Sequence, residues 1–260
     1  MGIAASISQN FKMTERINLK GGVLIIGSLL WQDHIDNDKK DNRRKLWRDR
    51  HLLLDHKIMV KVPIRYGRLS KSDIYTMTFS NSCRTTKQGT GFFVPFKQRP
   101  LTTFADLMNE VKETSIAEGM KGELLSKEKG TENIWCCMGL LTNPETVIKE
   151  TEKALITQWS EKVSEQGTLD ISQFKIGREK PCIDENGKLS LNWLSPVDKK
   201  DAEILNSYDL VIATATKPTK YPSIKELSEK VKADTKRYYF IQNYKFGITT
   251  FQDILVLNKI

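Results

Sequence analysis

The residues best suited to chemistry lie at the end of a strongly apolar segment, where the sequence reads Gly27-Ser28-Leu29-Leu30-Trp31. Glycine allows the backbone to turn sharply, and the amides that follow can converge on an anionic oxygen as a small nest. Gly27, Ser28 and Leu29 are therefore candidate substrate-binding residues. In the alternative interpretation, Gly27 only accommodates close packing and the Ser28 hydroxyl is hydrogen-bonded locally.

A second candidate cluster places Arg65, Arg68 and Lys71 around Gly67. A guanidinium group can bind a carboxylate or a phosphate through two parallel hydrogen bonds. We therefore treat Arg65 and Arg68 as candidate anion-binding residues. The alternative is that both form ion pairs at the protein surface.

A third cluster, residues 214–219, follows a predicted buried strand at a point where a sheet opens to ligands. Thr216 and Lys217 could bind an anion there. The cluster lacks the G-x-x-x-x-G-K-[ST] and G-x-G-x-x-G spacings, so it does not predict a nucleotide site.

The cysteines and histidines indicate no metal site. The four cysteines form no C-x-x-C pair, and the adjacent Cys136 and Cys137 would point to opposite faces of a strand. The three histidines show no zinc-ligand spacing, and we predict no cofactor. A nucleophilic pair of Cys137 or Cys83 with His56 is an open alternative without a local sequence signature.

Residues 25–32 resemble the strand and loop, written Y-G-S-L-x-W-N, that open the ChaC-like branch of the gamma-glutamylcyclotransferases. The order of features over residues 23–120 is also similar: a strand carrying Arg, a strand like Thr90-Gly-Phe-Phe-Val94, then a helical region that holds a catalytic Glu in the family. The G-S-L-x-W core matches closely, whereas Ile26 stands where the family has Tyr. The resemblance covers well under half of the chain and does not reach beyond residue 166.

This resemblance implies an intramolecular aminolysis. The α-amine of a γ-glutamyl amide attacks its own γ-carbonyl, which yields 5-oxoproline and a free amine. A partly buried Glu with a raised pKa suits deprotonation of the amine, and the amides of Ser28 and Leu29 suit a carboxylate or an oxyanion. Glu118, at the end of a predicted helix, is the first candidate base and Glu113 the second. The alternative for each is an exposed helix carboxylate.

The charge of the chain suggests a function of another class. Forty-one Lys and Arg against 32 Asp and Glu give a net charge of +9, which attracts anionic partners. The densest basic block, residues 34–51, holds seven Lys or Arg and four Asp. The runner-up hypothesis is a non-catalytic binding or effector-type protein that recognises an anion or nucleic acid through Arg65, Arg68 and residues 43–50. A solvated loop entering a short helix also explains this block.

Composition indicates a globular protein without a membrane span. Apolar residues are 39% and charged residues 28% of the chain, and no apolar run approaches the ~18 residues that a span needs. Free thiols are typical of a reducing compartment, so we expect a cytoplasmic protein. Residues 1–6 fit the M-G-x-x-x-[ST] myristoylation pattern, for which a flexible lead-in is the alternative.

Hydrophobic periodicity predicts the elements that must hold these residues. Residues 21–31 form a continuous apolar run typical of a central strand, and residues 57–96 predict a three-stranded antiparallel meander that closes on it. Further strands are expected at 133–142, 188–193 and 209–216, with a turn at 184–187. Helices are expected at 104–118 with Thr103 as N-cap, at 144–166 starting at Pro144, and at 223–232.

Together these elements predict an α+β fold. We expect a mixed, largely antiparallel sheet or small barrel with two packing helices and a C-terminal extension. The expected organisation is a flexible N-terminal lead (1–20), an α+β core domain (21–166), and a C-terminal lobe or extension of the same domain (167–260). The leading functional hypothesis is a small-molecule enzyme acting on an anionic or γ-glutamyl substrate.

Overall fold

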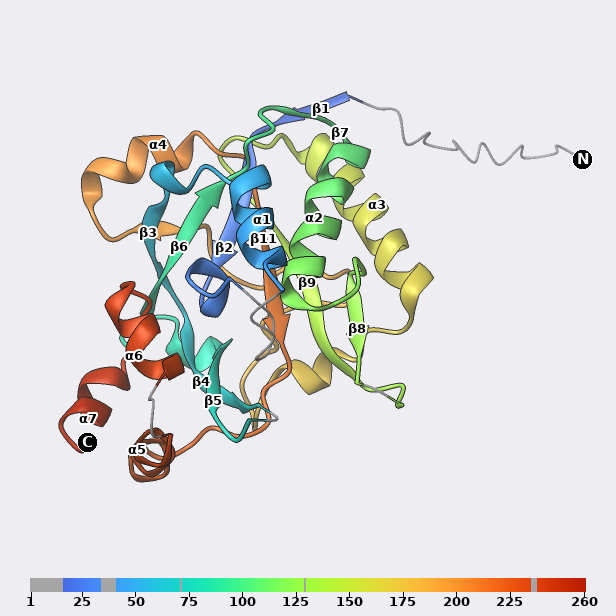
Figure 1. Cartoon of the computed structure of the whole chain (residues 1–260). Coiled ribbons are helices and arrows are strands. Elements are labelled where there is room, and N and C mark those ends of the chain that lie inside the picture. Colours follow the sequence, from blue (N-terminus) through green and yellow to red (C-terminus); the bar gives the residue numbers. More distant parts are fainter. Residues whose placement is uncertain (1–15, 34–40, 71, 129, 235–237) are drawn as a thin grey trace, which may run out of the picture.

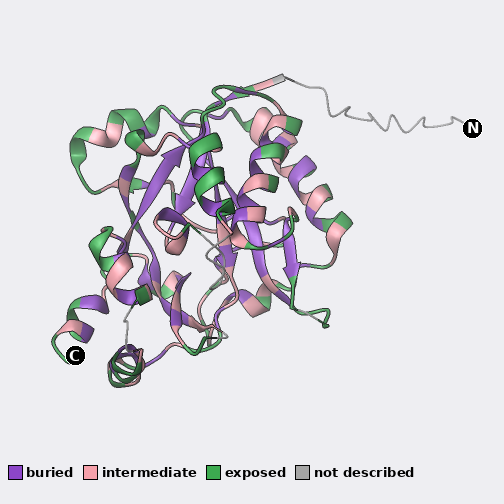
Figure 2. Ribbon diagram, viewed as in Figure 1, coloured by how far each residue is buried: buried purple, intermediate pink, exposed green. Residues whose placement is uncertain are grey.

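The computed structural model describes residues 16–33, 41–70, 72–128, 130–234 and 238–260 (Figure 1). The myristoylation pattern, Lys71 and residues 34–40 of the basic block lie outside the described residues. The described chain is α+β, as predicted, and its main element is a seven-stranded mixed sheet. Figure 2 shows the central strands of this sheet buried and the long helices beside it with both buried and exposed residues.

The main sheet is open, with an edge at β10 and another at β8, so the barrel alternative is not observed in the described chain. Among its pairings only β2 with β11 is parallel, and the others are antiparallel. In sheet order the strands are β10 (Ser195–Pro196), β3 (Ile58–Val62), β6 (Gly89–Pro95), β2 (Gly21–Ile25), β11 (Leu210–Thr216), β9 (Ile134–Thr142) and β8 (Leu125–Lys127).

The predicted central strand is β2, and each of its residues is buried between β6 and β11. Gly22 permits this close packing, because a Cβ at that position would lie 2.5 Å from the Phe93 ring. The strand ends at Ile25, earlier than the apolar run suggests. The chain then enters a short 3-10 helix, Ser28–Leu30, and we call residues 27–33 the Ser28 turn.

The predicted meander of residues 57–96 is wrong in its middle part. Pro63 separates β3 from β4 (Ile64–Leu69), and β4 pairs with β5 (Tyr75–Phe79) in a separate two-stranded sheet. Proline has no N–H to contribute to a continuing ladder, and the Pro63 carbonyl instead accepts a hydrogen bond from the Ser80 amide at 2.8 Å. The chain returns to the main sheet in β6, which closes on β2 as expected.

Two helices beside the sheet position the site. α2 (Phe104–Glu118) has the predicted bounds, because Thr103 and Asp106 form a capping box and Gly119 ends the helix with φ 86°. α1 (Arg43–His51) packs beside α2, and the two run next to each other in Figure 1. Another two-stranded sheet, β1 (Arg16–Leu19) with β7 (Leu101–Thr103), precedes α2.

The third long helix begins later than its sequence suggests. α3 (Lys149–Gln166) starts five residues after Pro144, because the Asn143 side chain accepts the Glu145 amide at 3.0 Å and closes a separate turn. The turn at 184–187 is confirmed by a bond from the Gly187 amide to the Asp184 carbonyl. Beyond it, Lys188 and Leu189 make only isolated bridges in place of the predicted strand at 188–193.

The C-terminal part of the chain contributes to the main sheet through β11, which lies between β2 and β9. α4 (Ala202–Asn206) precedes β11. After β11 come α5 (Ile224–Ala233), which has the predicted Ser223 N-cap, α6 (Tyr238–Lys245) and α7 (Asp253–Leu257). In Figure 1 these last three helices gather at one end of the molecule, beside β4 and β5.

Candidate functional site

A cavity of about 800 Å³, here called the main cavity, opens at the carboxyl ends of β2 and β11. These two strands are parallel neighbours, so their ends meet at the same edge of the sheet. The remaining walls include the Ser28 turn, β4 and β5, and residues of β9, α1, α2 and α6. A volume of this size is typical of small-molecule sites.

The structure brings five of the seven predicted site residues together. These five line the main cavity: Gly27, Ser28, Leu29, Arg68 and Glu118. They come from three elements far apart in the sequence: the Ser28 turn, β4 and the end of α2.

The other two predicted residues lie elsewhere. Glu113 is absent from the cavity wall, and its Oε2 lies 4.0 Å from Nε2 of His51. The guanidinium carbon of Arg65 lies 4.0 Å from the centre of the Tyr221 ring, in a cation–π contact outside the main cavity.

Glu118 is a carboxyl group in a partly buried setting. Its side chain is 22% exposed, and burial raises the pKa of the carboxyl. The positive charges of Arg44 and Arg68 and a hydrogen bond with Thr214 act in the opposite direction on this pKa. A raised pKa makes a carboxylate a stronger base than an ordinary one, which suits it to accept a proton.

Arg44 joins the Ser28 turn to the end of α2. Its Nη1 donates to Ser28 Oγ at 3.0 Å and to Gln32 Oε1 at 2.7 Å, while its Nε donates to the Ala117 carbonyl at 3.0 Å. Its Nη2 lies 3.9 Å from Oε2 of Glu118. The side chain is only 9% exposed, so this basic residue is an internal part of the site.

Arg48 supports the same turn one helical turn later in α1. Its Nη1 donates to the carbonyls of Leu29 at 2.7 Å and Gln32 at 2.8 Å, and its Nη2 pairs with Asp33. Arg44 and Arg48 are four residues apart and therefore share one helix face. This spacing, with the buried Trp47 between them, is the sequence signal that could have identified an inward-facing pair within the basic block.

Tyr239 of α6 lines the cavity beside Gly27. Its hydroxyl oxygen accepts a hydrogen bond from the Met77 amide at 3.3 Å. Burial raises the pKa of this phenol to about 12, so the hydroxyl keeps a proton that it can donate. The sequence reasoning did not single out Tyr239, and only the packing of α6 against the turn shows it.

The tryptophan of the G-S-L-x-W motif holds α6 in place. Trp31 Nε1 donates to Asn243 Oδ1 at 2.9 Å, and Asn243 in turn donates from Nδ2 to the Tyr239 carbonyl at 2.9 Å. The Trp31 ring also contacts the Tyr238 ring, with centroids 5.1 Å apart. The motif thus positions Tyr239 as well as the turn.

Arg68 lies over Trp135, with its guanidinium carbon 4.3 Å from the ring centre, and both residues line the cavity. Thr214 and Thr216 of β11 also line it. The Thr216 hydroxyl is buried without a hydrogen-bond partner in the described part of the chain. The predicted partner of Thr216, Lys217, instead donates to Gln173 Oε1 at 2.8 Å.

The cysteines do not contribute a nucleophile to this cavity. Cys83 and Cys137 are buried, burial raises the pKa of both thiols, and His56 is exposed. None of these three residues lines the main cavity. Within the described ranges, His, Cys, Asp and Glu form no group that could hold a metal ion.

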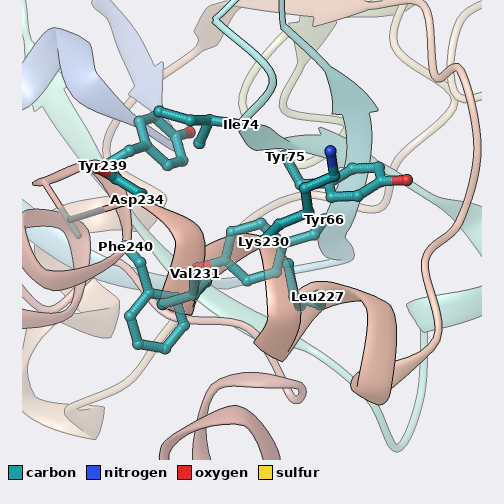
Figure 3. Close-up of a pocket in the computed structure, with 9 residues that line it drawn as sticks. All are labelled: Tyr66, Ile74, Tyr75, Leu227, Lys230, Val231, Asp234, Tyr239 and Phe240. Atoms are coloured by element: carbon teal, nitrogen blue, oxygen red, sulfur yellow. The ribbon is translucent and has the colours of Figure 1, made fainter. Parts of the chain in front are cut away.

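Figure 3 shows a second cavity, between α5, α6 and the β4–β5 sheet. It measures about 10 Å³, which is close to the space that a single water molecule requires. Tyr239 lines both cavities, but only the main cavity can hold a substrate.

The chain matches no protein-family model, no curated protein and no solved structure. Each helix in the described ranges is too short or too polar to cross a bilayer.

Proposed function

We propose that this protein is a small-molecule enzyme of the gamma-glutamylcyclotransferase type, which forms 5-oxoproline from a γ-glutamyl amide. The observation that carries the proposal is the location of Glu118 in the same cavity as the Gly27–Leu29 segment. A carboxyl group suited to accept a proton thus lies beside the turn on which the family resemblance rests. Because the four cysteines are buried free thiols, the proposal includes a cytoplasmic location.

In the proposed reaction, the ionised Glu118 takes a proton from the substrate α-ammonium group. The freed nitrogen forms a bond to the γ-carbonyl carbon, and the bond from that carbon to the departing nitrogen then breaks. Two protons from the attacking nitrogen end on the departing amine, which leaves as an ammonium ion. Glu118 therefore returns to its ionised form without a cofactor.

Other cavity residues suit the remaining tasks. Arg68 can bind the substrate carboxylate, since it is one of the residues that line the cavity. The Tyr239 hydroxyl can donate a hydrogen bond to the oxyanion that develops on the γ-carbonyl oxygen. The Ser28 and Leu29 amides stay candidates for the same two anionic groups.

The alternative, an anion-binding or nucleic-acid-binding protein, has weaker support. Arg44 and Arg48 are buried, and Arg68 lies in the main cavity. The Arg65 guanidinium stacks on the Tyr221 ring, so it already has a partner within the protein. The arginines behind this hypothesis therefore do not form one common exposed surface.

The test is a mass-spectrometric assay for 5-oxoproline with a panel of γ-glutamyl amides that includes glutathione. We expect product with the wild type and none with Glu118→Gln. The matched control is Glu113→Gln, on the same helix but outside the cavity wall, which we expect to retain activity. Product that survives in Glu118→Gln would move the base elsewhere, and no product from any substrate would reject the proposed function.

A further inference from the structure

Arg44 contacts both the Ser28 turn and the end of α2 that carries Glu118. Its guanidinium touches the Ser28 hydroxyl, the Gln32 side chain and the last turn of α2, and it faces Glu118. We propose that Arg44 is a positioning residue, which fixes the Glu118 carboxylate relative to the Ser28 turn and keeps that carboxylate charged. This inference rests on the proposed function.

The hydrogen bonds of Arg44 explain how it can position Glu118 without donating a hydrogen bond to the carboxylate. A guanidinium has five N–H donors. Three are engaged: Nε with Ala117, and both Nη1 hydrogens with Ser28 and Gln32. The remaining Nη2 lies 3.9 Å from the Glu118 carboxylate, which is too long for a direct hydrogen bond but close enough for charge attraction. The carboxylate oxygen therefore stays available to accept a proton from a substrate.

Arg44 is also the main positive charge acting on Glu118. The charged groups that influence this carboxyl are Arg44 from α1 and Arg68 from β4, and Glu118 in turn acts on Cys136 of β9 and Tyr239 of α6. Burial raises the pKa of Cys136 and Tyr239, so both are neutral near pH 7. The arginines are the charges that remain, and Arg44 has the larger effect of the two.

Removing the positive charge of Arg44 should therefore allow burial to raise the pKa of Glu118 further. In Arg44→Gln, we expect the Glu118 carboxyl to titrate about 1 pH unit higher than in the wild type. A base must be ionised to act, so the acidic limb of the kcat/KM profile should shift to higher pH by the same amount. Arg44→Lys keeps the charge but not the planar fork, so it should retain the wild-type titration while lowering kcat.

The experiment is a carbon-13 NMR titration of Glu-labelled protein, with Glu118→Gln used to assign the resonance, alongside the pH profile of 5-oxoproline formation. The matched control is Arg43→Gln, whose side chain is 52% exposed on the same helix and which should match the wild type. An unchanged Glu118 titration in Arg44→Gln would overturn the proposal. Loss of folding in both Arg44→Gln and Arg44→Lys would also overturn it, because Arg44 would then be a structural residue.

The two proposals fail in different ways. If the wild type forms no 5-oxoproline, the proposed function is rejected, and the positioning role of Arg44 in that reaction falls with it. If product forms but the pH profile and the titration are the same in Arg44→Gln and the wild type, only the role of Arg44 is rejected.

Discussion

The hydroxyl of Tyr239 lies 3.0 Å from the point that a Cβ of Gly27 would occupy. The φ of Gly27 is −170°, an extended value open to any residue, so the backbone itself does not demand glycine. A side chain at this position would instead meet the phenol, which would have to shift by a few tenths of an ångström. This contact connects the G-S-L-x-W motif to a residue more than 200 positions away.

Gly27→Ala should therefore shift the Tyr239 hydroxyl within the cavity. We expect a loss of stability of about 1–3 kcal/mol in urea unfolding, together with reduced 5-oxoproline formation. The control is the same substitution in a Tyr239→Phe background, where no hydroxyl meets the new methyl group and the stability cost should be smaller. Equal costs in the two backgrounds would show that the contact does not decide the requirement for glycine.

Glu118→Gln should abolish turnover while stabilising the fold at neutral and higher pH. Because burial raises the pKa of Glu118, the folded state holds a proton that the unfolded state has already released. The free energy of unfolding therefore falls as the pH rises from the pKa of an ordinary carboxyl through the raised pKa of Glu118 in the folded protein. Above that raised pKa the loss of stability is complete. Thermal unfolding from pH 4 to 8 should show the Tm advantage of Glu118→Gln growing with pH; an advantage at pH 4 that disappears by pH 8 would contradict this.

Arg48→Ala should destabilise the Ser28 turn, because Arg48 donates hydrogen bonds to its backbone. The substitution leaves the Leu29 and Gln32 carbonyls without their charged donor, so we expect a loss of about 3 kcal/mol in urea unfolding. Arg50→Ala, exposed on the same helix, should change stability by less than about 0.5 kcal/mol. Similar losses in the two variants would mean that the turn does not depend on Arg48.

Thr216→Val should affect binding more than stability. The hydroxyl has no hydrogen-bond partner in the described chain, so an isosteric methyl group removes no bond from the folded protein. We expect an unchanged or slightly higher Tm and a raised KM. Thr214→Val is the comparison. Losing the Thr214 hydroxyl removes a hydrogen bond that lowers the pKa of Glu118, so this variant should shift the pH profile instead. A KM equal to that of the wild type would place the substrate away from Thr216.

Salt dependence separates the two functional hypotheses. Removal of the exposed charges in a variant with Arg43→Ala and Arg50→Ala should leave 5-oxoproline formation unchanged. If the basic block instead serves nucleic acid, the variant should bind a DNA or RNA duplex less tightly and with a smaller salt slope. Filter-binding assays at several salt concentrations measure both quantities.

Several elements could be predicted from the sequence because their causes are local. The continuous apolar run of β2 predicts burial, and the Thr103 cap with Gly119 predicts both ends of α2. The β4–β5 hairpin shows the limit of this reasoning. Its alternation is typical of a strand, but alternation does not show which sheet a strand joins, and Pro63 redirects the chain.

The sequence by itself determined the types of residue at this site, the ends of α2 and the apolar centre of the sheet. The tertiary structure decided which carboxyl faces the cavity. Glu113 and Glu118 lie on one helix, but five residues correspond to a rotation of about 140° around the helix axis, so packing directs them to different surroundings. The tertiary structure also turned Arg44 and Arg48 inward and brought Tyr239 to Gly27. These contacts join segments that are far apart in the chain, so no local sequence pattern predicts them.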